Sequence, residues 1–338
     1  MSKAKQGVLL INLGTPDSPA TSDVRKYLRE FLMDRRVIDI PFINRYLLIN
    51  LIIAPFRAPK SAKIYKELWE EKGSPLKTIG FEVKDLLQKS LGSEYQVELG
   101  MRYQSPSIAT ALENLKNKGL SKITVIPLYP QYASASTGSS LEEVMNIIKD
   151  WEIIPELKLI SEFSGNEKMI SIFAKTSKKY SSAVKYDHFI FSYHGLPERQ
   201  ILKGSCNSYC KLGSCCNSFN SLNRFCYRAQ CFNTSRILAK QLGLTESDYT
   251  VSFQSRLGKT PWIKPYTDEM IKELAAKGKK KILCFSPSFV ADCLETTIEI
   301  GEEYKELFLK EGGEVWQLVE SLNTDPEWIE CLSEMVLS

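Results

Sequence analysis

The sequence predicts an α/β protein whose parallel strands are joined by crossover helices. Two observations predict this fold class: short runs of β-branched and large apolar residues recur along the chain, and segments with apolar residues at helical spacing lie between them. Strands so continuously apolar are typical of buried sheets. The runs are Val8–Leu13, Val97–Leu99, Ile123–Leu128, Phe189–Tyr193, Thr250–Phe253, Ile282–Phe285 and Val315–Val319.

Two expected helices, Ile108–Leu115 and Met270–Leu274, end in a shared pattern. Residues 115–123 and 274–282 both read L-x-x-K-G-x-x-K-I, a helix end whose glycine leads into the next strand. The match favours two similar α/β lobes. Convergence on a common helix-stop chemistry explains it equally well.

The composition is that of a globular protein. The 338 residues are 43% hydrophobic and 25% charged, with a net charge of +4. These values exclude a disordered, collagenous or membrane-spanning chain, and they give no basic excess that points to nucleic acid. The N-terminal stretch lacks the length and the cleavage site of a signal peptide, so we expect a cytoplasmic protein. Monomer and homodimer both stay open.

Residues 40–56 form the most apolar stretch of the chain, interrupted by two prolines, two asparagines and Arg45. The stretch is shorter than the roughly 20 apolar residues of a transmembrane helix. We expect a core helix here. The alternative is an apolar lip that contacts a membrane surface or a large flat apolar ligand.

In the first half of the chain, polar or small residues follow the expected strands, where open α/β sheets bind ligands. Leu13 ends the first run, Arg102 and Tyr103 follow the second, and Ser136 and Thr137 belong to a loop that opens a helix. Small residues let backbone N–H groups approach an acidic group at a helix N-terminus. The loop lacks both glycine-rich phosphate motifs, so we expect no nucleotide.

His194, one of two histidines, comes directly after the Phe189–Tyr193 run and is followed by Gly195. A neutral imidazole at a strand end serves as a general base or a metal ligand, although a lone histidine is more often structural. His188, at the start of the same run, is expected to be structural. Gln254, Ser255 and Trp262 belong to another polar and aromatic strand end. A tryptophan there either stacks on a flat ligand or caps the core, which is its commoner use.

Four carboxylates share one stripe of the helix expected after Phe285. At about 100° per residue, Asp292, Glu295, Glu299 and Glu303 fall within roughly one quarter of the circumference. A solvated face is the usual explanation of such a stripe. With the strand-end histidine, the stripe would instead supply nitrogen and oxygen ligands suited to a divalent transition metal.

Six of the nine cysteines lie between Cys206 and Cys231, with no histidine among them. In a reducing compartment, such clustering indicates metal ligation or reactive thiols. Thiolate-only ligation fits an iron–sulfur cluster or structural zinc, but the segment has neither ferredoxin spacing nor paired C-x2-C. On spacing alone, a cluster, zinc and unliganded thiols all stay open.

Together these motifs resemble those of the ferrochelatases. The resemblance extends over nearly the whole chain in family order, through Leu10–Asp17, Met101–Tyr103, Tyr129–Tyr132, Thr137–Ser140, Phe191–Pro197, Phe253–Arg256, Thr260–Trp262 and Asp292–Thr296. It implies a chelatase-like fold of two Rossmann-like lobes, which we place at 1–165 and 166–338, with the active-site cleft between them. It also implies insertion of Fe²⁺ into protoporphyrin with release of two protons, without nucleotide.

The resemblance assigns roles to single residues. His194 and Glu295 would hold the iron substrate and move protons, with Asp292, Glu299 and Glu303 as an outer acidic path. Cys293 departs from the pattern, because animal members carry a histidine at that position. The residues expected to contact the porphyrin are Leu13, Arg57, Arg102, Tyr103, Ser136, Thr137, Gln254, Ser255 and Trp262.

The cysteine-rich stretch at residues 205–226 resembles an insertion in bacterial ferrochelatases that hold an internal 2Fe-2S cluster. The resemblance favours Cys210, Cys215, Cys216 and Cys226 as ligands over Cys206 and Cys231. The expected partners are porphyrin and ferrous iron, with peripheral membrane contact through residues 40–56. Two alternatives stay open: coproporphyrin as the substrate, and a non-enzymatic iron–sulfur or metal-handling protein, which should not bind porphyrin.

Overall fold

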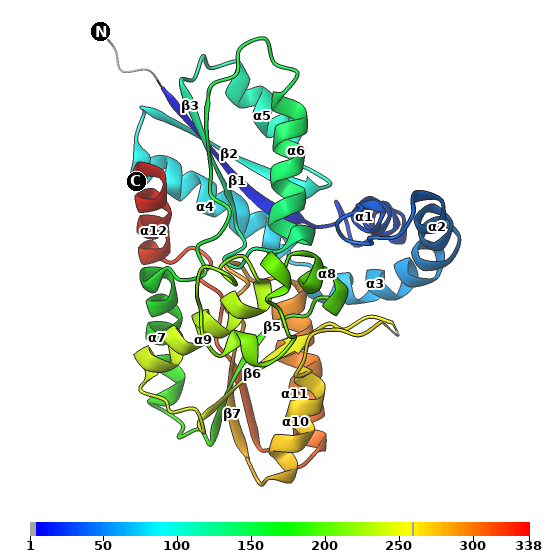
Figure 1. The fold of residues 1–338 in the computed structure, drawn as a ribbon, viewed down its shortest axis with the longest axis vertical. Helices are drawn as coiled ribbons and strands as arrows, with labels where there is room; N and C mark the ends of the chain where they lie inside the picture. The colour runs from blue at the N-terminus through cyan, green and yellow to red at the C-terminus, as the bar shows by residue number, and fades with distance from the viewer. Residues whose placement is uncertain (1–4, 259) are drawn as a thin grey trace. The chain divides into compact units, whose positions relative to one another are not determined.

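The structure is a computed structural model that describes residues 5–258 and 260–338. In this part of the chain, the strands form two four-stranded parallel sheets flanked by helices, as the sequence predicts (Figure 1). The strand orders are β2-β1-β3-β4 and β6-β5-β7-β8. The strands are β1 (Gln6–Gly14), β2 (Tyr95–Tyr103), β3 (Lys122–Pro127), β4 (Glu156–Leu159), β5 (His188–His194), β6 (Tyr249–Gln254), β7 (Lys281–Phe285) and β8 (Val315–Leu318).

Helices of three kinds connect the strands. The α-helices are α1 (Thr21–Met33), α2 (Phe42–Leu47), α3 (Ala54–Leu68), α4 (Pro75–Leu91), α5 (Ile108–Lys116), α6 (Ser139–Ile148), α7 (Glu167–Ser181), α8 (Glu198–Lys203), α9 (Tyr227–Leu242), α10 (Thr267–Ala276), α11 (Tyr304–Lys310) and α12 (Pro326–Leu337). The π-helical segments are η1 (Leu48–Ile53), η2 (Ser134–Gly138) and η5 (Glu295–Glu303). The 3-10 turns are η3 (Cys206–Ser208) and η4 (Ser214–Cys216).

The shared pattern of residues 115–123 and 274–282 marks equivalent places in the two sheets. Helix α5 leads through Gly119, at φ +62°, into β3, and α10 leads through Gly278, at φ +79°, into β7. Both strands hold the third position in their sheets. A left-handed backbone after a helix end favours glycine, which explains the shared residue.

The chain divides into two compact units. The first unit consists of the residues up to Tyr129, Ala133–Glu162 and Thr324–Ser338; the second consists of Pro130–Tyr132 and Phe163–Asn323. This division differs from contiguous lobes at 1–165 and 166–338, because α12 returns to the first unit. There Ser333 Oγ lies 2.9 Å from Ser90 Oγ of α4, and Lys158 Nζ of β4 donates to Met335 O at 2.9 Å.

Each sheet buries an apolar helical face. In the first unit, α5 and α6 lie against the sheet (Figure 1). Their side chains Ile108, Leu112 and Val144 pack with Leu9 and Val125 of the strands. In the second unit, the corresponding core joins side chains of α10, α11 and η5 to three strands, and it consists of Ile190, Ile271, Leu274, Ile282, Cys284, Ile300, Phe308 and Trp316. These buried faces hold the strand ends in fixed positions.

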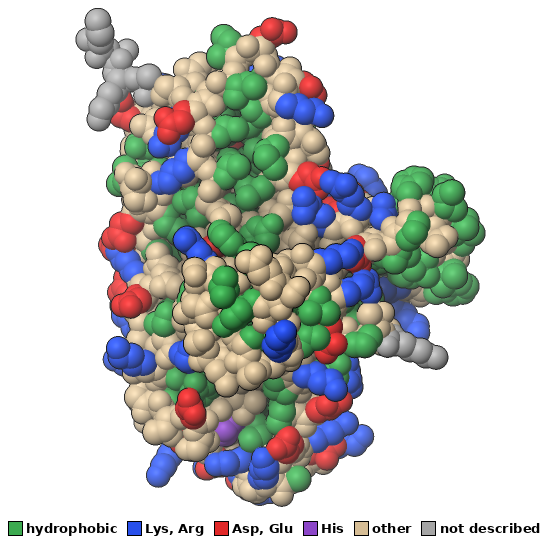
Figure 2. Space-filling model, viewed as in Figure 1, with side chains coloured by type: hydrophobic (Ala, Val, Ile, Leu, Met, Phe, Trp, Pro, Cys, Tyr) green, Lys and Arg blue, Asp and Glu red, His purple; other side chains and the backbone are tan. Residues whose placement is uncertain are grey.

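Residues 40–56 do not form the core helix that we expected. They form α2, η1 and the start of α3, and most of their large side chains face outward: Ile43 is 69% exposed and Phe56 is 74% exposed. Hydrophobic side chains gather over this region in Figure 2. We call this surface the apolar lip; it consists of Phe42, Ile43, Tyr46, Leu47, Leu51, Ile52 and Phe56. Among the described residues, no helix has the length and apolar character to cross a bilayer.

Candidate active site

His194 occupies the carboxyl end of β5, a central strand of the second sheet. Its Nδ1 lies 2.7 Å from the carbonyl oxygen of Gly195. A carbonyl oxygen only accepts hydrogen bonds, so Nδ1 must carry the proton. In the neutral imidazole, Nε2 then keeps the lone pair and can accept a proton or bind a metal ion.

Gly195 lets three chain segments meet beside this imidazole. Its N–H donates to Gln254 O at 2.9 Å, and a Cβ at this position would lie 2.7 Å from that oxygen and 3.1 Å from the Trp262 ring. Any side chain here would therefore displace the Gln254 backbone and crowd the Trp262 ring. The ring centroid of the half-buried Trp262 lies 6.4 Å from that of His194, and the rings are inclined by 49°. The structure thus brings these two predicted site residues together.

Gln254 ends β6, directly opposite His194 in the parallel register. Its Nε2 donates to Glu299 Oε2 at 3.1 Å and to the backbone oxygen of Glu295 at 3.3 Å. Ser192 Oγ donates to the other end of the amide, Oε1, at 2.8 Å. Both ends of the amide are therefore fixed. The network joins the strand beside His194 to the carboxylate-bearing segment η5.

Glu299 is held by three donors. Besides Gln254, Ser255 Oγ donates to its Oε2 and Tyr304 OH donates to its Oε1 at 3.1 Å. Burial and the nearby Glu299 charge raise the pKa of Tyr304, so that its phenol stays protonated and able to donate. Ser255 takes φ +63°, a left-handed conformation that is unusual for serine and that concentrates at functional sites.

The four carboxylates do not form the single regular stripe that we expected. Asp292 precedes the helix, and its carboxylate accepts hydrogen bonds from Asn323 Nδ2 at 2.7 Å and from the Ser321 N–H at 3.1 Å. Glu295, Glu299 and Glu303 lie on the π-helical segment η5, whose turns are wider than those of an α-helix. Among the described residues, no three His, Cys, Asp or Glu side chains converge as a metal site.

Cys293 contacts Glu295, the first carboxylate of η5. Its buried thiol hydrogen-bonds to the Glu295 side chain, and burial together with the Glu295 charge raises the thiol pKa well above its usual value. The thiol therefore stays neutral and donates to the carboxylate.

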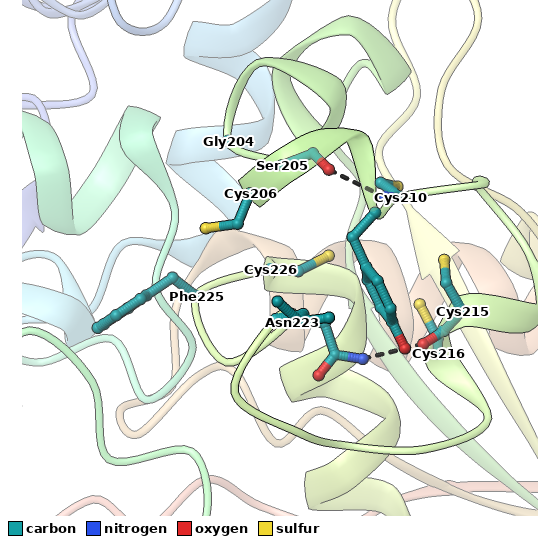
Figure 3. A pocket seen from close by; sticks show the side chains of 11 residues that line it. Gly204, Ser205, Cys206, Cys210, Cys215, Cys216, Asn223, Phe225 and Cys226 are labelled. Atoms are coloured by element: carbon teal, nitrogen blue, oxygen red, sulfur yellow. Dashed lines mark hydrogen bonds between the residues drawn. The ribbon is translucent and has the colours of Figure 1, made fainter.

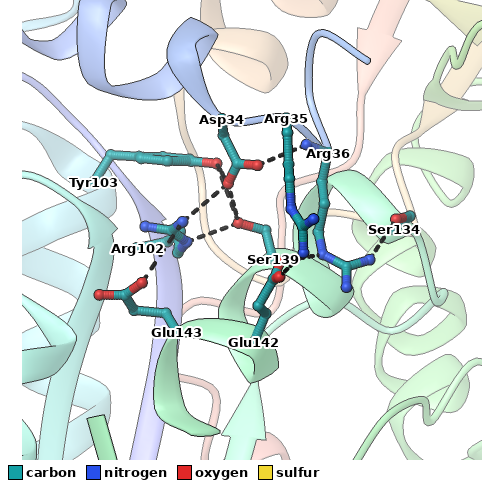
Figure 4. A network of polar contacts seen from close by, with 9 residues as sticks. All are labelled: Asp34, Arg35, Arg36, Arg102, Tyr103, Ser134, Ser139, Glu142 and Glu143. Atoms are coloured by element: carbon teal, nitrogen blue, oxygen red, sulfur yellow. Dashed lines mark hydrogen bonds and ion pairs between the residues drawn. The ribbon is translucent and has the colours of Figure 1, made fainter. Parts of the chain in front are cut away.

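Arg102 and Tyr103, at the end of β2, belong to a polar network in the first unit (Figure 4). Arg102 donates to Asp34 Oδ2 at 2.9 Å and to Ser139 Oγ at 2.7 Å, and Tyr103 OH donates to Asp34 Oδ2 at 2.9 Å. Burial opposes ionisation of Asp34, but hydrogen bonds from Ser139, the Arg36 backbone and Tyr103 hold its pKa below its usual value. The guanidinium is thus already paired with a carboxylate.

The other residues expected to contact porphyrin in this unit are spread over several elements. Leu13 is half-buried near the end of β1, and Arg57 is exposed on α3 beside the apolar lip. Ser136 and Thr137 lie in η2. Thr137 is fully buried with its Oγ1 unpaired, and the N–H groups of Ser136 and Gly138 already donate to Ala133 O. The expected anion cradle therefore has few N–H groups to offer.

Five cysteines line one pocket of the second unit (Figure 3). Cys206, Cys210, Cys215, Cys216 and Cys226 approach it from the segment before α9. The Lys211 N–H donates to Cys215 Sγ at 3.3 Å, and the Leu212 N–H donates to Cys210 Sγ at 3.4 Å. Donors of this kind stabilise thiolate charge.

The thiols of this cysteine pocket interact with one another. A hydrogen bond between Cys216 and Cys226 raises the pKa of Cys216 and lowers that of Cys226, and the pKa of Cys210 is raised by burial and then by Cys215 and Cys216. Cys206 is exposed at the rim. Cys231 is fully buried in α9 and does not line the pocket.

The sequence did not predict several residues of these hydrogen-bond networks. Asp34 is the shared acceptor of the Figure 4 network, and Tyr304 supports Glu299. Tyr227 OH donates to the His194 carbonyl at 2.8 Å. The only signal for Asp34 was its position before two arginines, and Tyr227 gave none beyond its place next to Cys226.

A sequence model of the family described as Ferrochelatase matches residues 5–338. The chain is 50% identical over 333 residues to a ferrochelatase of Legionella pneumophila (strain Paris), covering 98% of each chain. It is 43% identical over 332 residues to a ferrochelatase of Coxiella burnetii (strain Dugway 5J108-111), covering 98% of this chain and 93% of that one.

Among solved structures, SirB from Bacillus subtilis with Fe³⁺ aligns with a TM-score of 0.56 at 12% identity, covering 98% of this chain and 94% of that one. The sirohydrochlorin chelatase SirB from Bacillus subtilis subspecies spizizenii in complex with cobalt gives 0.55 at 11% identity, with the same coverage. These structures share the fold alone. On the family match and the sequence identities, the chain belongs to the ferrochelatase family.

Proposed function

We propose that the carboxyl ends of β5 and β6, with η5, form the site of the family reaction, insertion of ferrous iron into protoporphyrin in haem synthesis. The observation that carries this assignment is the His194 imidazole, whose Nδ1 is committed to Gly195 so that Nε2 keeps its lone pair. Iron insertion needs a group that removes protons from the porphyrin, and Nε2 is a nitrogen of the right kind.

The reaction is a metal-for-proton exchange. A porphyrin has four ring nitrogens, two of them protonated, and iron takes their place only after both protons leave. A planar ring hides these N–H groups from a base at its face, so the enzyme must bend the ring with binding energy from remote contacts. Trp262, close to the imidazole, and the apolar lip are the surfaces that we assign to this task.

His194 Nε2 would accept a pyrrole proton, and Glu295 would relay protons or deliver iron. The neutral Cys293 thiol hydrogen-bonds to Glu295 and orients its carboxylate. Glu299, one turn farther along η5, accepts hydrogen bonds from Gln254, Ser255 and Tyr304. Three donors therefore fix the position of this carboxylate, which suits an outer site better than a group that delivers metal.

The acidic groups of the porphyrin need cationic or hydrogen-bonding partners. Arg57 is exposed and next to the apolar lip, so we assign it to a propionate. Arg102 is paired with Asp34 and would act by holding the end of β2 in place. Ser136, half-buried in η2, is the second residue that we propose as a hydrogen-bonding partner of a propionate.

We further propose that Cys210, Cys215, Cys216 and Cys226 hold a 2Fe-2S cluster. Among the described residues these thiols do not already converge as a metal site. Their fit rests on an all-thiol donor set in one pocket, on backbone N–H donors to two of the sulfurs and on the pKa shifts that the thiols cause in one another. When bound, such a cluster can exchange one electron and cross-links the loop that ligates it. Iron insertion transfers no electrons, so the cross-link is the contribution that we assign to it.

An anaerobic assay tests the proposed substrate. Fe²⁺ insertion would be followed by the loss of free-porphyrin fluorescence, with protoporphyrin and coproporphyrin supplied at equal concentrations. We expect the higher kcat/KM with protoporphyrin. A clear preference for coproporphyrin would reassign the substrate, and failure to insert iron into either would overturn the site assignment.

We also propose that the apolar lip makes peripheral contact with a membrane surface.

A further inference from the structure

The first turn of α9 contacts both the cysteine pocket and the His194 strand end. Cys226 lines the pocket, and the next residue, Tyr227, donates its hydroxyl to the His194 carbonyl at 2.8 Å. Arg228 follows and donates to Gly213 O, in the cysteine loop, at 3.2 Å. Three consecutive residues therefore join the pocket to the peptide that carries the imidazole.

Tyr227 is built into the protein with little freedom to move. The residue is 7% exposed, and the thiol of Cys231, one helical turn later, hydrogen-bonds to its hydroxyl. A buried carbonyl requires a donor, and the phenol supplies one to His194 O. Because that carbonyl belongs to the peptide between His194 and Gly195, the hydroxyl fixes the backbone on which the imidazole turns.

Arg228 anchors the same turn to the other side of the site. It is 8% exposed, its Nη2 donates to Lys264 O at 3.1 Å, and its guanidinium lies 4.5 Å from the ring centroid of Phe232. It also hydrogen-bonds to the Cys216 thiol. Lys264 follows Trp262 by two residues, so the arginine links a pocket sulfur to the segment that carries the tryptophan.

We propose that Tyr227 is a positioning residue for His194, and that the first turn of α9 transmits the state of the cysteine pocket to the imidazole. A change at Cys216 or Cys226 shifts this turn, and the phenol passes the shift to the His194 peptide. The inference rests on the proposed role of His194 as the base. It gives the cysteine pocket, which takes no part in iron insertion, a route by which to affect the rate of insertion.

Tyr227→Phe tests the positioning role, because it removes the hydroxyl and keeps the ring. Tyr193→Phe is the matched control: that phenol is also buried and joins β5 to α9, but it hydrogen-bonds to Ser235 Oγ at 2.8 Å instead of the His194 carbonyl. We expect Tyr227→Phe to lower kcat about tenfold with the porphyrin KM unchanged, since misplacing a catalytic group costs up to about a hundredfold. The control should keep wild-type kinetics.

A second readout does not depend on activity. Diethyl pyrocarbonate modifies neutral imidazoles, and mass spectrometry separates the chain's two histidines, with the buried His188 as an internal reference. Tyr227→Phe should raise the modification rate of His194 severalfold, because the imidazole is less restrained. If Tyr227→Phe and Tyr193→Phe give the same rates and the same kcat, the positioning role is wrong. Failure of wild-type protein to insert iron would instead reject the proposed function.

The coupling to the pocket is tested by a double-variant cycle. Cys216→Ser should raise the His194 modification rate in wild-type protein and add nothing in the Tyr227→Phe background, because the connection is already cut. Cys206→Ser, at the exposed rim of the same pocket, should leave the rate unchanged in both backgrounds. An equal increase from Cys216→Ser in both backgrounds would show that the pocket acts on His194 by another route, and would overturn the coupling.

Discussion

The side-chain amide of Gln254 donates to the carboxylate of Glu299 at 3.1 Å, so the strand next to His194 is hydrogen-bonded to the carboxylate-bearing segment η5. The same amide reaches the backbone of Glu295 at 3.3 Å. A neutral amide that is fixed at both ends gives the two glutamates defined positions relative to the imidazole. These hydrogen bonds make η5 part of the site. They distinguish the two glutamates, because Gln254 bonds the carboxylate of Glu299 but the backbone of Glu295.

His194→Ala should abolish iron insertion while porphyrin still binds. The variant removes the imidazole but keeps the apolar surfaces, so the Soret band should still shift on mixing. A positioned general base contributes at least about a hundredfold. Activity above about a tenth of wild type, measured anaerobically, would rule out His194 as the essential base. His188→Gln is the control, since His188 lies at the opposite end of the same strand and should not affect the reaction.

Glu295→Gln should lower activity far more than Glu303→Gln. Both changes remove one charge at nearly constant volume, but Glu295 begins η5 beside Gln254, whereas Glu303 ends the segment and is exposed. The comparison requires kcat/KM for Fe²⁺ at fixed porphyrin. Equal losses would mean that the carboxylates act as one diffuse field and do not form a graded path.

The sequence predicts the fold because the spacing of apolar residues indicates which strands and helix faces are buried. The apolar runs of the sequence predict seven of the eight strands described in the structure. They do not predict β4, because Glu156–Leu159 is a short edge strand with two charged residues. The apolar lip shows where burial cannot be predicted from an apolar run. An apolar run at residues 40–56 predicts burial, but the chain turns those side chains outward, and composition alone does not distinguish a core helix from an exposed apolar surface.

The site was predictable where chemistry follows directly after a strand. His194 and Gln254 come together because parallel strand ends meet at one sheet edge. Partners that are far apart in sequence were not predictable: Asp34 and Arg102 are separated by 68 residues, and no local pattern pairs them. Asp292 does not share a helix face with the three glutamates, because the π-helical segment begins only at Glu295.

His188 should make stability depend on pH. It is 5% exposed, and burial, followed by the Lys279 charge, lowers its pKa from 6.5 to about 4. Between these values the unfolded chain binds more protons than the folded one. The contribution of His188 to the free energy of unfolding should therefore be complete above pH 6.5 and be lost as the pH drops toward 4, by on the order of 3 kcal/mol.

His188→Gln isolates this contribution. Glutamine can still hydrogen-bond to Thr250, which lies 2.8 Å from the imidazole Nε2. The free energy of unfolding of both proteins would be measured with urea across this pH range. The difference between the wild-type and variant values should change with pH as expected for His188. Parallel curves would show that other groups cause the acid sensitivity.

The apolar lip should bind membranes without contributing to folding. Ile43→Ser combined with Leu51→Ser replaces two exposed side chains, so the free energy of unfolding should change by about 0.5 kcal/mol or less per site. Sedimentation with phospholipid vesicles should fall. Ile153→Ser, at an exposed isoleucine outside the lip, is the control and should sediment as wild type does. Unchanged sedimentation would reject the membrane contact, and an unchanged porphyrin KM would reject the role of the lip in porphyrin binding.

The cysteine pocket should give purified protein a red-brown colour that bleaches on reduction, because four thiolates would bind a ferric pair, whereas Zn²⁺ is colourless. Cys215→Ser should be colourless, poorly stable and largely inactive, since it loses a ligand and a sulfur to which the Lys211 N–H donates. Cys231→Ser should stay coloured, because Cys231 does not line the pocket. Iron and acid-labile sulfide analysis decides between the alternatives: zinc without sulfide would reject the cluster, and a colourless Cys231→Ser would reject this choice of ligands.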